Sequence, residues 1–278
     1  MRALRLVVTI LSRYGGPAGF YTTASALAVL FLFPLVWSGW SSVKGQPGTP
    51  QGSGYGFGNY AALLHYGEGL GTYALNSAIV SVITVVGTLV VSSLGGYAFA
   101  RFAFPGKNLL FIATLAILMV PYATILIPLY VFLGYLHLQN TLVGLALVFV
   151  MFQLPFATFM MRNSFEAVPR ELEEAALVDG CGTFQALVRV LLQAVRPGLI
   201  TVGLFAFLAS WNEFLAPLVL LNDGAKFTLP VAVAGITNGT FGGILESGVM
   251  IMAIPCLILF LLLQRHYVRG FVSGALGG

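Results

Sequence analysis

Two stretches of this chain place polar side chains where they can do chemistry. The first is the run from Val168 to Gly180, which holds four carboxylates in a sequence that is 58% hydrophobic and only 8% charged. The second is Trp211-Asn212-Glu213, which interrupts a long apolar run. A charged run that lies outside a membrane can meet a soluble partner, and a carboxylate inside a membrane can line a polar path.

Glu213 lies near the middle of a predicted membrane span. A charged residue at the centre of such a span costs about 2.5 to 3.5 kcal/mol on insertion scales, so it usually has a function. We interpret Trp211, Asn212 and Glu213 as part of a translocation path or its gate, since they offer aromatic stacking and hydrogen bonds to a polar solute. Two alternatives stay open: Glu213 pairs with a polar neighbour to fix helix packing, or it is the proton or cation site of an ion-coupled secondary transporter.

The charged run has the local signals of a short helix. Pro169 suits the first helical position, and the three glutamates that follow it complement the positive end of the helix dipole. Gly180 suits a left-handed C-terminal cap, because glycine has no Cβ. The pattern therefore predicts a helix over residues 170–179, although a solvated helix start would explain the acids equally well.

A second, amphipathic helix is predicted directly after the first. Its apolar residues recur at the spacing of one helical face, which would lie against the bilayer or the helix bundle. These residues are Phe184, Leu187, Val188, Leu191, Leu192 and Val195. Together the two helices form a helix-Gly-helix element over about residues 169–195.

The sequence shows no catalytic or nucleotide-binding motif. Gly106-Lys107 is followed by Asn108 and lacks the earlier glycine of a phosphate-binding loop, so we expect no ATP binding by that device. The three histidines are spread over separate loops and form no metal-ligand set. Cys181 and Cys256 do not indicate a disulfide framework, and we expect both to be reduced. These absences predict a chain that is not an enzyme and has no metal or cofactor of its own.

Membrane helices must position these residues. The chain has 278 residues, a mean hydropathy of +0.94 and several apolar stretches of about 20 residues, which places it in the polytopic membrane class. One domain over residues 1–278 accounts for it. We predict six spans, at about residues 19–40, 72–97, 109–134, 139–161, 197–221 and 247–263.

The segments between and within these spans carry further signals. Residues 41–71 are rich in Gly, Pro and Ser and cannot bury a core of their own, so they are predicted to form an external loop, like the Gly-rich residues 222–246. Pro121 and Pro128 predict a broken or kinked third span. Asn76-Ser77 is interpreted as a helix cap. Close helix packing is predicted at Gly87, Gly95 and Gly96.

The basic residues predict the orientation of the spans. If alternate loops are assigned to the cytoplasm, 11 of the 13 Lys and Arg residues lie inside and only Lys44 and Lys226 lie outside. Both termini and the loop that holds Glu174 are then cytoplasmic, in a bacterial-type plasma membrane. The net charge of +4 follows from this topology, and nothing indicates nucleic-acid binding.

The motifs of the charged run resemble those of a known family. Glu174-Ala175-Ala176, Asp179-Gly180 and Pro197-Gly198-Leu199 are similar to the EAA loop of ABC importer permeases, specifically the carbohydrate type that includes the maltose permease. The resemblance extends from about residue 20 onward. It also covers Asn59-Tyr60, Asn76-Ser77, the stretch from Tyr97 to Phe102, the stretch from Phe104 to Lys107, and the stretch from Trp211 to Phe214.

The resemblance implies a fold, a function and partners. The fold is the type I ABC importer permease fold, all-α with six transmembrane helices and a cytoplasmic coupling element. The chain would form half of the translocation pathway for a sugar or oligosaccharide; polyols, amino sugars and glycerol phosphates are alternatives. Its partners would be a second permease subunit in a heterodimer, an ATPase dimer that binds ATP and Mg, and an extracytoplasmic solute-binding protein. The residues implied in coupling are Glu173, Glu174, Ala175, Ala176, Asp179 and Gly180.

Two residues depart from the family pattern. Gln193 stands where many members carry a proline, so we expect a weaker kink between the amphipathic helix and the next span. Cys181 replaces a residue that is usually alanine, which should not disturb docking. A membrane scaffold without a transport function remains a third class of protein, and Glu213 argues against it.

Overall fold

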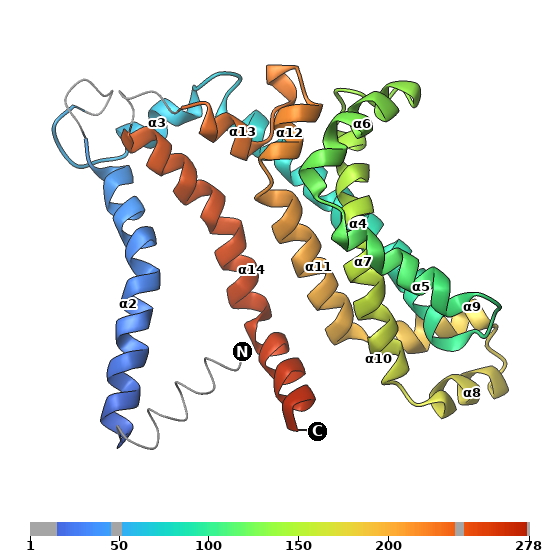
Figure 1. Cartoon of the computed structure of the whole chain (residues 1–278). Helices are drawn as coiled ribbons and strands as arrows, with labels where there is room; N and C mark the ends of the chain where they lie inside the picture. Colours follow the sequence, from blue (N-terminus) through green and yellow to red (C-terminus); the bar gives the residue numbers. More distant parts are fainter. Residues whose placement is uncertain (1–15, 46–51, 237–241, 277–278) are drawn as a thin grey trace. The chain divides into compact units, whose positions relative to one another are not determined.

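The computed structural model describes residues 16–45, 52–236 and 242–276, and these residues are mainly α-helical (Figure 1). Their only strand-like pairing is an isolated bridge between Lys44 and Tyr55. The predicted all-α class is therefore confirmed. The basic residues Arg2, Arg5 and Arg13, on which part of the predicted orientation rests, lie outside the described residues.

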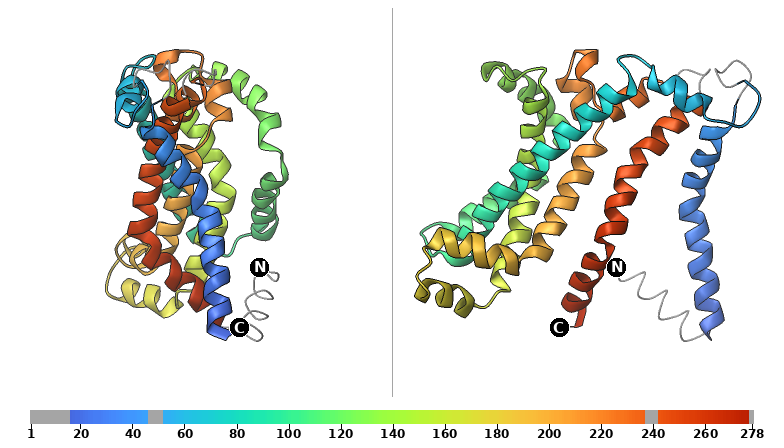
Figure 2. Two further views of the ribbon diagram at one scale, coloured as in Figure 1. Left: turned by 90° about the vertical axis from the view of Figure 1, so that its left-hand side faces the viewer. Right: turned by 180° about the vertical axis from the view of Figure 1, so that it is seen from behind.

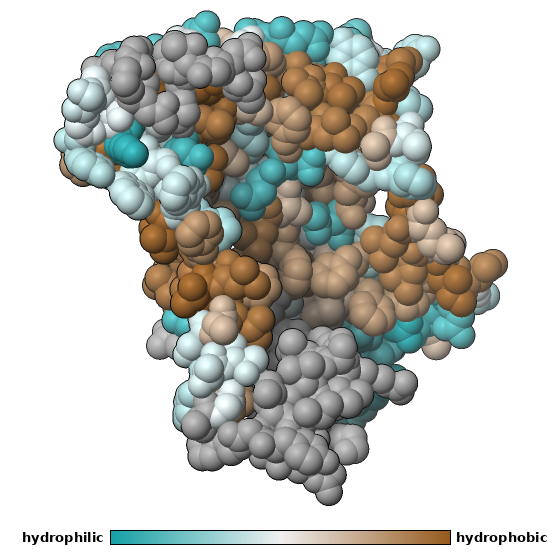
Figure 3. Space-filling view, turned by 60° about the vertical axis from the view of Figure 1, so that its left-hand side comes forward, coloured by the Kyte–Doolittle hydropathy of each residue, from teal (hydrophilic) through white to brown (hydrophobic). Residues whose placement is uncertain are grey.

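Four of the described helices are long and apolar enough to cross a membrane unaided. They are α2 (Gly16–Val43), α4 (Leu70–Arg101), α7 (Leu142–Glu166) and α14 (Gly242–Leu276). Much of the face drawn in Figure 3 is hydrophobic, as expected of helices that meet lipid.

Two further spans are bent pairs of helices. The first pair joins α5 (Lys107–Ala116) and the 3-10 turn η1 (Ile117–Met119) to α6 (Tyr122–Tyr135), with a bend of 103°. The second joins α9 (Thr183–Ala186), η2 (Leu187–Leu191) and α10 (Leu192–Ala194) to α11 (Arg196–Trp211), with a bend of 81°. Counting each bent pair as one span gives up to six spans among the described residues.

The bends follow from proline only in part. The break before α6 is at Pro121, as predicted, since proline has no N–H to donate, whereas Pro128 lies inside α6. With Gln193 in place of the usual proline, the chain turns by 81° between α10 and α11; whether this kink is weaker than in members with the proline stays a prediction. The turn falls at Val195, two residues before Pro197 in the first turn of α11.

The prediction that the apolar residues of 184–195 share one helical face is partly wrong. η2 is a turn of π-helix, and its wider turn shifts the residues that follow relative to an α-helical face. Ala186, Leu187 and Leu191 are buried, whereas Phe184 is 69% exposed and Val188 is exposed.

The described chain divides into two compact units. The first comprises Met1–Leu63 and Ile236–Ile251. In it Asn59, at the start of α3 (Gly58–Leu64), is fully buried and donates to the main-chain oxygens of Ser42 (2.9 Å) and Lys44 (3.2 Å). The Ser247 hydroxyl donates to the same Ser42 oxygen. Among the described residues of the predicted 41–71 loop, buried hydrogen bonds thus fix α3 to the end of α2, so this part is not a loop without a core.

The second unit comprises Leu64–Gly235 and Met252–Gly278. In it α4, α7 and α11 pack side by side, with α6 and α12 (Leu215–Leu220) at one end and α8 (Arg170–Val178), α9 and α10 at the other (Figures 1 and 2). Gly96 permits the close approach of α4 to α7: a Cβ there would lie 2.6 Å from the Cβ of Met161. A hydrophobic core that includes Tyr97, Phe165 and Leu191 lies under the end that carries α8.

The interpretation of Asn76 and Ser77 as helix caps is wrong, because α4 begins earlier, at Leu70. The Asn76 amide donates instead to the main-chain oxygens of Ala225 (2.9 Å) and Phe227 (3.0 Å), and the Ser77 hydroxyl accepts from the Leu229 N–H (2.8 Å). These bonds fix the 3-10 turn η3 (Gly224–Lys226) and the largely buried helix α13 (Leu229–Ala234). The predicted loop over residues 222–246 thus contains a packed helix.

Candidate functional site

The charged run forms the short helix α8, almost as predicted. Pro169 occupies the N-cap position and not the first helical position, and Glu171 and Glu173 lie in the first turn. Gly180 has a φ of +88°, as its role of left-handed cap requires. The Gly180 and Cys181 N–H groups donate to the main-chain oxygens of Leu177 and Ala176, which is the Schellman pattern that ends a helix.

The predicted coupling residues divide into an outward and an inward set. Glu174, Ala175, Asp179 and Gly180 lie on the exposed surface of α8 and of the turn that follows it. Ala176 is buried. α8 itself lies at the end of the second unit opposite α6 and α12, so its exposed face is open to a partner (Figure 2).

Glu173 belongs to the inward set, which the sequence analysis did not anticipate. Its Oε1 accepts a hydrogen bond of 2.5 Å from the Tyr97 hydroxyl, and its Oε2 lies 3.0 Å from the Arg101 Nε. Arg101 also donates from Nη2 to the main-chain oxygen of Val168 (2.9 Å). Tyr97 and Arg101 are one helical turn apart at the end of α4, a spacing that sequence reasoning could have singled out.

The second predicted group, Trp211-Asn212-Glu213, does not lie inside a continuous span. α11 ends at Trp211, and the chain breaks before α12 begins at Leu215. Trp211 is 6% exposed, and its Nε1 donates to the main-chain oxygen of Met252 (3.0 Å). Asn212 is exposed, and its amide donates back to the Leu208 oxygen (2.9 Å).

Glu213 lies where two helix breaks meet. Its Oε1 accepts from the Tyr122 hydroxyl, at the start of α6, and from the N–H groups of Leu215 (2.9 Å) and Ala216 (3.4 Å), in the first turn of α12. The carboxylate thus complements the N-terminus of α12, where negative charge is stabilised. The internal pairing that we kept open as an alternative is present, and Tyr122 is the partner that the sequence did not reveal.

A cavity of about 260 Å³ opens beside this carboxylate. Glu213 and Tyr122 line it together with Gln153, Phe149 and Phe152. Aromatic faces with a few placed hydrogen-bonding groups are typical of small-molecule sites. The rest of the lining is aliphatic, from Ile117, Leu118, Val120 and Ala209, and of all these residues the sequence analysis had found only Glu213.

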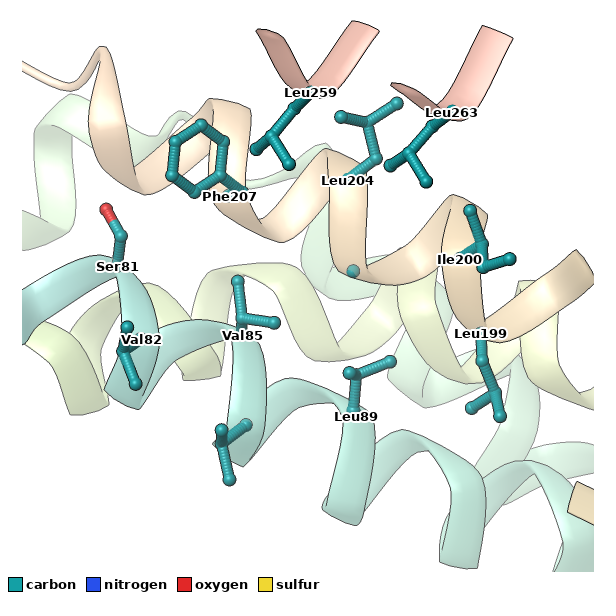
Figure 4. Close-up of a pocket in the computed structure, with 12 residues that line it drawn as sticks. Ser81, Val82, Val85, Leu89, Leu199, Ile200, Leu204, Phe207, Leu259 and Leu263 are labelled. Carbon is teal, nitrogen blue, oxygen red and sulfur yellow. The ribbon is translucent and has the colours of Figure 1, made fainter. Parts of the chain in front are cut away.

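A larger groove of about 620 Å³ has a different chemistry. Figure 4 shows aliphatic and aromatic side chains of α4, α11 and α14 turned toward it, among them Val85, Leu204 and Leu259. Ser81 supplies the one hydroxyl in its lining. Such a lining suits hydrocarbon and offers almost nothing to a hydrophilic solute.

Comparison with known families and proteins gives consistent matches. Residues 92–272 match the model of a family described as "Binding-protein-dependent transport system inner membrane component". This match includes α8, Gly180 and Glu213.

Individual relatives and a solved structure agree with that match. The chain is 34% identical to the trehalose transport system permease protein SugB of Mycobacterium tuberculosis, over 91% of this chain and 92% of that protein. It is 37% identical to the diacetylchitobiose uptake system permease protein DasC of Streptomyces coelicolor, over 74% and 76% of the two chains. A chain of a bacterial ABC transporter involved in alginate import has a similar fold, with a TM-score of 0.77, 21% identity and coverage of 95% and 98%.

Proposed function

Because the chain belongs to the family of inner membrane components of binding-protein-dependent transport systems, we propose that it carries a sugar or oligosaccharide across the membrane as half of a two-chain pathway. The chain is a multi-pass permease subunit of an ABC importer and not an enzyme. The observation that carries the proposal is α8, a capped helix of nine residues whose Glu174 face is exposed at one end of the bundle. A soluble subunit needs such an element to push on.

The proposed partners follow from the family. A second permease subunit completes the pathway as a heterodimer, an ATPase dimer docks on α8, and a solute-binding protein delivers the substrate on the other side. ATP and Mg are bound by the ATPase, since this chain lacks a phosphate-binding loop. In this arrangement α8 and both termini face the cytoplasm, which agrees with the 11 to 2 distribution of the basic residues.

The chemistry of the substrate is proposed from two sources. Relatives at 34% and 37% identity are named for trehalose and diacetylchitobiose transport. The cavity beside Glu213 combines aromatic rings with an amide, a phenol and a carboxylate. Sugars present apolar faces and hydroxyl edges, so this combination suits them better than it suits an inorganic ion.

The proposed mechanism couples the two ends of the second unit. ATP binding closes the ATPase pair and moves α8, and the attached helices turn the pathway from inward-facing to outward-facing. Glu213 is placed to respond, since its carboxylate joins the start of α6 to the start of α12. When either helix moves, this contact must break or carry the other helix with it.

Co-purification tests the proposal. The tagged chain, expressed together with its neighbouring genes, should bring down a second permease and an ATPase from detergent-solubilised membranes. Glu174→Lys reverses a charge on the exposed face of α8, so it should lose the ATPase and retain the second permease. Recovery of the chain alone, or an ATPase that stays bound in Glu174→Lys, would contradict the proposed docking.

A further inference from the structure

We propose that Glu173 is a positioning residue for coupling, which locks α8 onto α4 so that α4 carries the movement of α8 to the segment over residues 222–235. This inference rests on the proposed function and assigns Glu173 a role apart from the exposed face of α8. Tyr97, Arg101 and Glu173 are called the α4–α8 lock below.

The lock holds α8 at two points. One guanidinium, that of Arg101, lies 3.0 Å from the Glu173 carboxylate and also donates to the oxygen of Val168 at 2.9 Å. Val168 precedes the N-cap of α8, and Glu173 lies in its first turn. The planar guanidinium, which cannot lose its charge, thus fixes both the position of the helix start and its rotation. The Tyr97 hydroxyl also donates a hydrogen bond to the Glu173 carboxylate, across 76 residues of sequence.

The lock is largely withdrawn from solvent, unlike the comparable pair on α7. The side chains of Arg101 and Glu173 are 7% and 13% exposed. In the pair Arg162 and Glu166, the side chains are 23% and 42% exposed, and both residues belong to one helix. Exposed pairs within a helix contribute little. Removing one partner of a shielded pair leaves the other charge without compensation, so the lock resists displacement.

α4 is a continuous helix that can move as one body when α8 is displaced. The helix is unbroken from Leu70 to Arg101, and Gly96 seats it directly on the backbone of α7. Near its other end, Asn76 and Ser77 hold the oxygen of Phe227 and the N–H of Leu229. Ser77 and Arg101 are separated by about 36 Å of helix. A displacement of α8 therefore reaches α13 through one rigid element that is hydrogen-bonded at both ends.

The experiment uses the complete complex of this chain, its second permease and its ATPase in proteoliposomes, with the solute-binding protein added. The measured quantity is the amount of solute transported per ATP hydrolysed. Glu173→Gln keeps the size of the side chain and removes its charge. We expect normal recovery of the complex and a ratio reduced about fivefold or more, the lower end of measured couplings between sites.

Glu166→Gln is the matched control, because it removes the same charge from the exposed pair on α7 and leaves α8 untouched. Its ratio should stay within about twofold of the parent. Tyr97→Phe retains the ring and removes one hydroxyl, so it should lower the ratio less than Glu173→Gln does. The double variant Glu173→Gln with Arg101→Gln should have the same transport ratio as Arg101→Gln alone, since both substitutions remove one and the same contact.

Four results would overturn the inference. A Glu173→Gln ratio equal to that of Glu166→Gln shows that the lock does not transmit. A lower yield of complex at an unchanged ratio shows a role in folding alone. Additive losses in the double variant show that Arg101 and Glu173 act separately. If the parent complex itself shows no ATP-dependent uptake, the proposed function fails and the inference fails with it.

Discussion

The Tyr122 hydroxyl donates to the Glu213 carboxylate, and this hydrogen bond joins two helix breaks that lie 91 residues apart in the sequence. The same carboxylate accepts from two N–H groups of α12. It therefore holds the starts of α6 and α12 together beside a cavity of about 260 Å³.

Glu213→Gln should leave assembly nearly intact and impair transport or its coupling to ATP hydrolysis. The amide oxygen of Gln can still accept from Tyr122 and from the α12 N–H groups, whereas the negative charge is lost. Yield of the complex and uptake in proteoliposomes are the measurements. A variant that assembles and transports like the parent refutes a role in the path, and one that fails to assemble supports a packing role. Tyr122→Phe is the companion variant, since it removes the hydroxyl that donates to Glu213. It should lower the free energy of unfolding by about 1.5 to 3 kcal/mol, the range for hydrogen bonds to charged groups.

Gly180→Val should give an inserted protein with weaker ATPase recruitment or uncoupled hydrolysis. Gly180 has a φ of +88°, and a Cβ there would meet no atom within 4 Å. A side chain at this position therefore meets no clash, but it disfavours the left-handed backbone. That conformational cost is about 1 to 2 kcal/mol, and more for a β-branched residue. That is too little to unfold the bundle but enough to tilt α8.

Gly182→Val provides the matched control for Gly180→Val. A Cβ at Gly182 also meets open space, but its φ of −72° and ψ of 161° suit a β-branched residue. Gly182→Val and Cys181→Ala should therefore be nearly silent in co-purification and in transport. Equal behaviour of the two valine variants would show that α8 does not depend on the left-handed cap.

Gly96→Ala should destabilise the second unit, and Gly95→Ala should not. A Cβ at Gly96 would lie 2.6 Å from the Met161 Cβ and 2.8 Å from the Arg162 nitrogen, whereas one at Gly95 would lie 3.5 Å from the Thr158 methyl carbon. Overpacking of this kind lowers the free energy of unfolding by about 1 to 3 kcal/mol. Thermal unfolding in detergent measures the difference. Equal midpoints for the two variants would contradict the close α4–α7 contact.

Cysteine labelling tests the orientation. In a background of Cys181→Ala and Cys256→Ser, we expect Glu174→Cys to react with an impermeant reagent only in inverted vesicles. Tyr55→Cys, on the 41–71 segment, should react in intact cells. Both native side chains are exposed in the structure, so access depends on the side of the membrane. Labelling of Glu174→Cys from outside would overturn the topology.

Local patterns predicted the elements well. Apolar stretches of about 20 residues correspond to helices, because length and hydropathy decide what crosses a membrane. The start of α8 near Pro169 and the positive φ of Gly180 were also predictable, because both depend on the conformational limits of single residues.

Long-range partners could not be predicted from the same patterns. Asn76 looked like a cap, yet its amide bonds to Ala225, 149 residues away. Glu173 and Glu174 are adjacent acids that local propensity treats alike, yet Glu173 turns inward to Arg101 and Tyr97 while Glu174 stays exposed. The break after Trp211 was missed because hydropathy continues across it, although α11 ends there and the Glu213 carboxylate accepts from the first N–H groups of α12.

The most direct test of the central claim is uptake by proteoliposomes that contain the complete complex, with a panel of sugars and the solute-binding protein. We predict that uptake of one sugar requires both ATP and the binding protein, and that it persists when ionophores collapse all ion gradients. Uptake that follows a proton or cation gradient without ATP, and that is lost in Glu213→Gln, would contradict the account and identify an ion-coupled transporter.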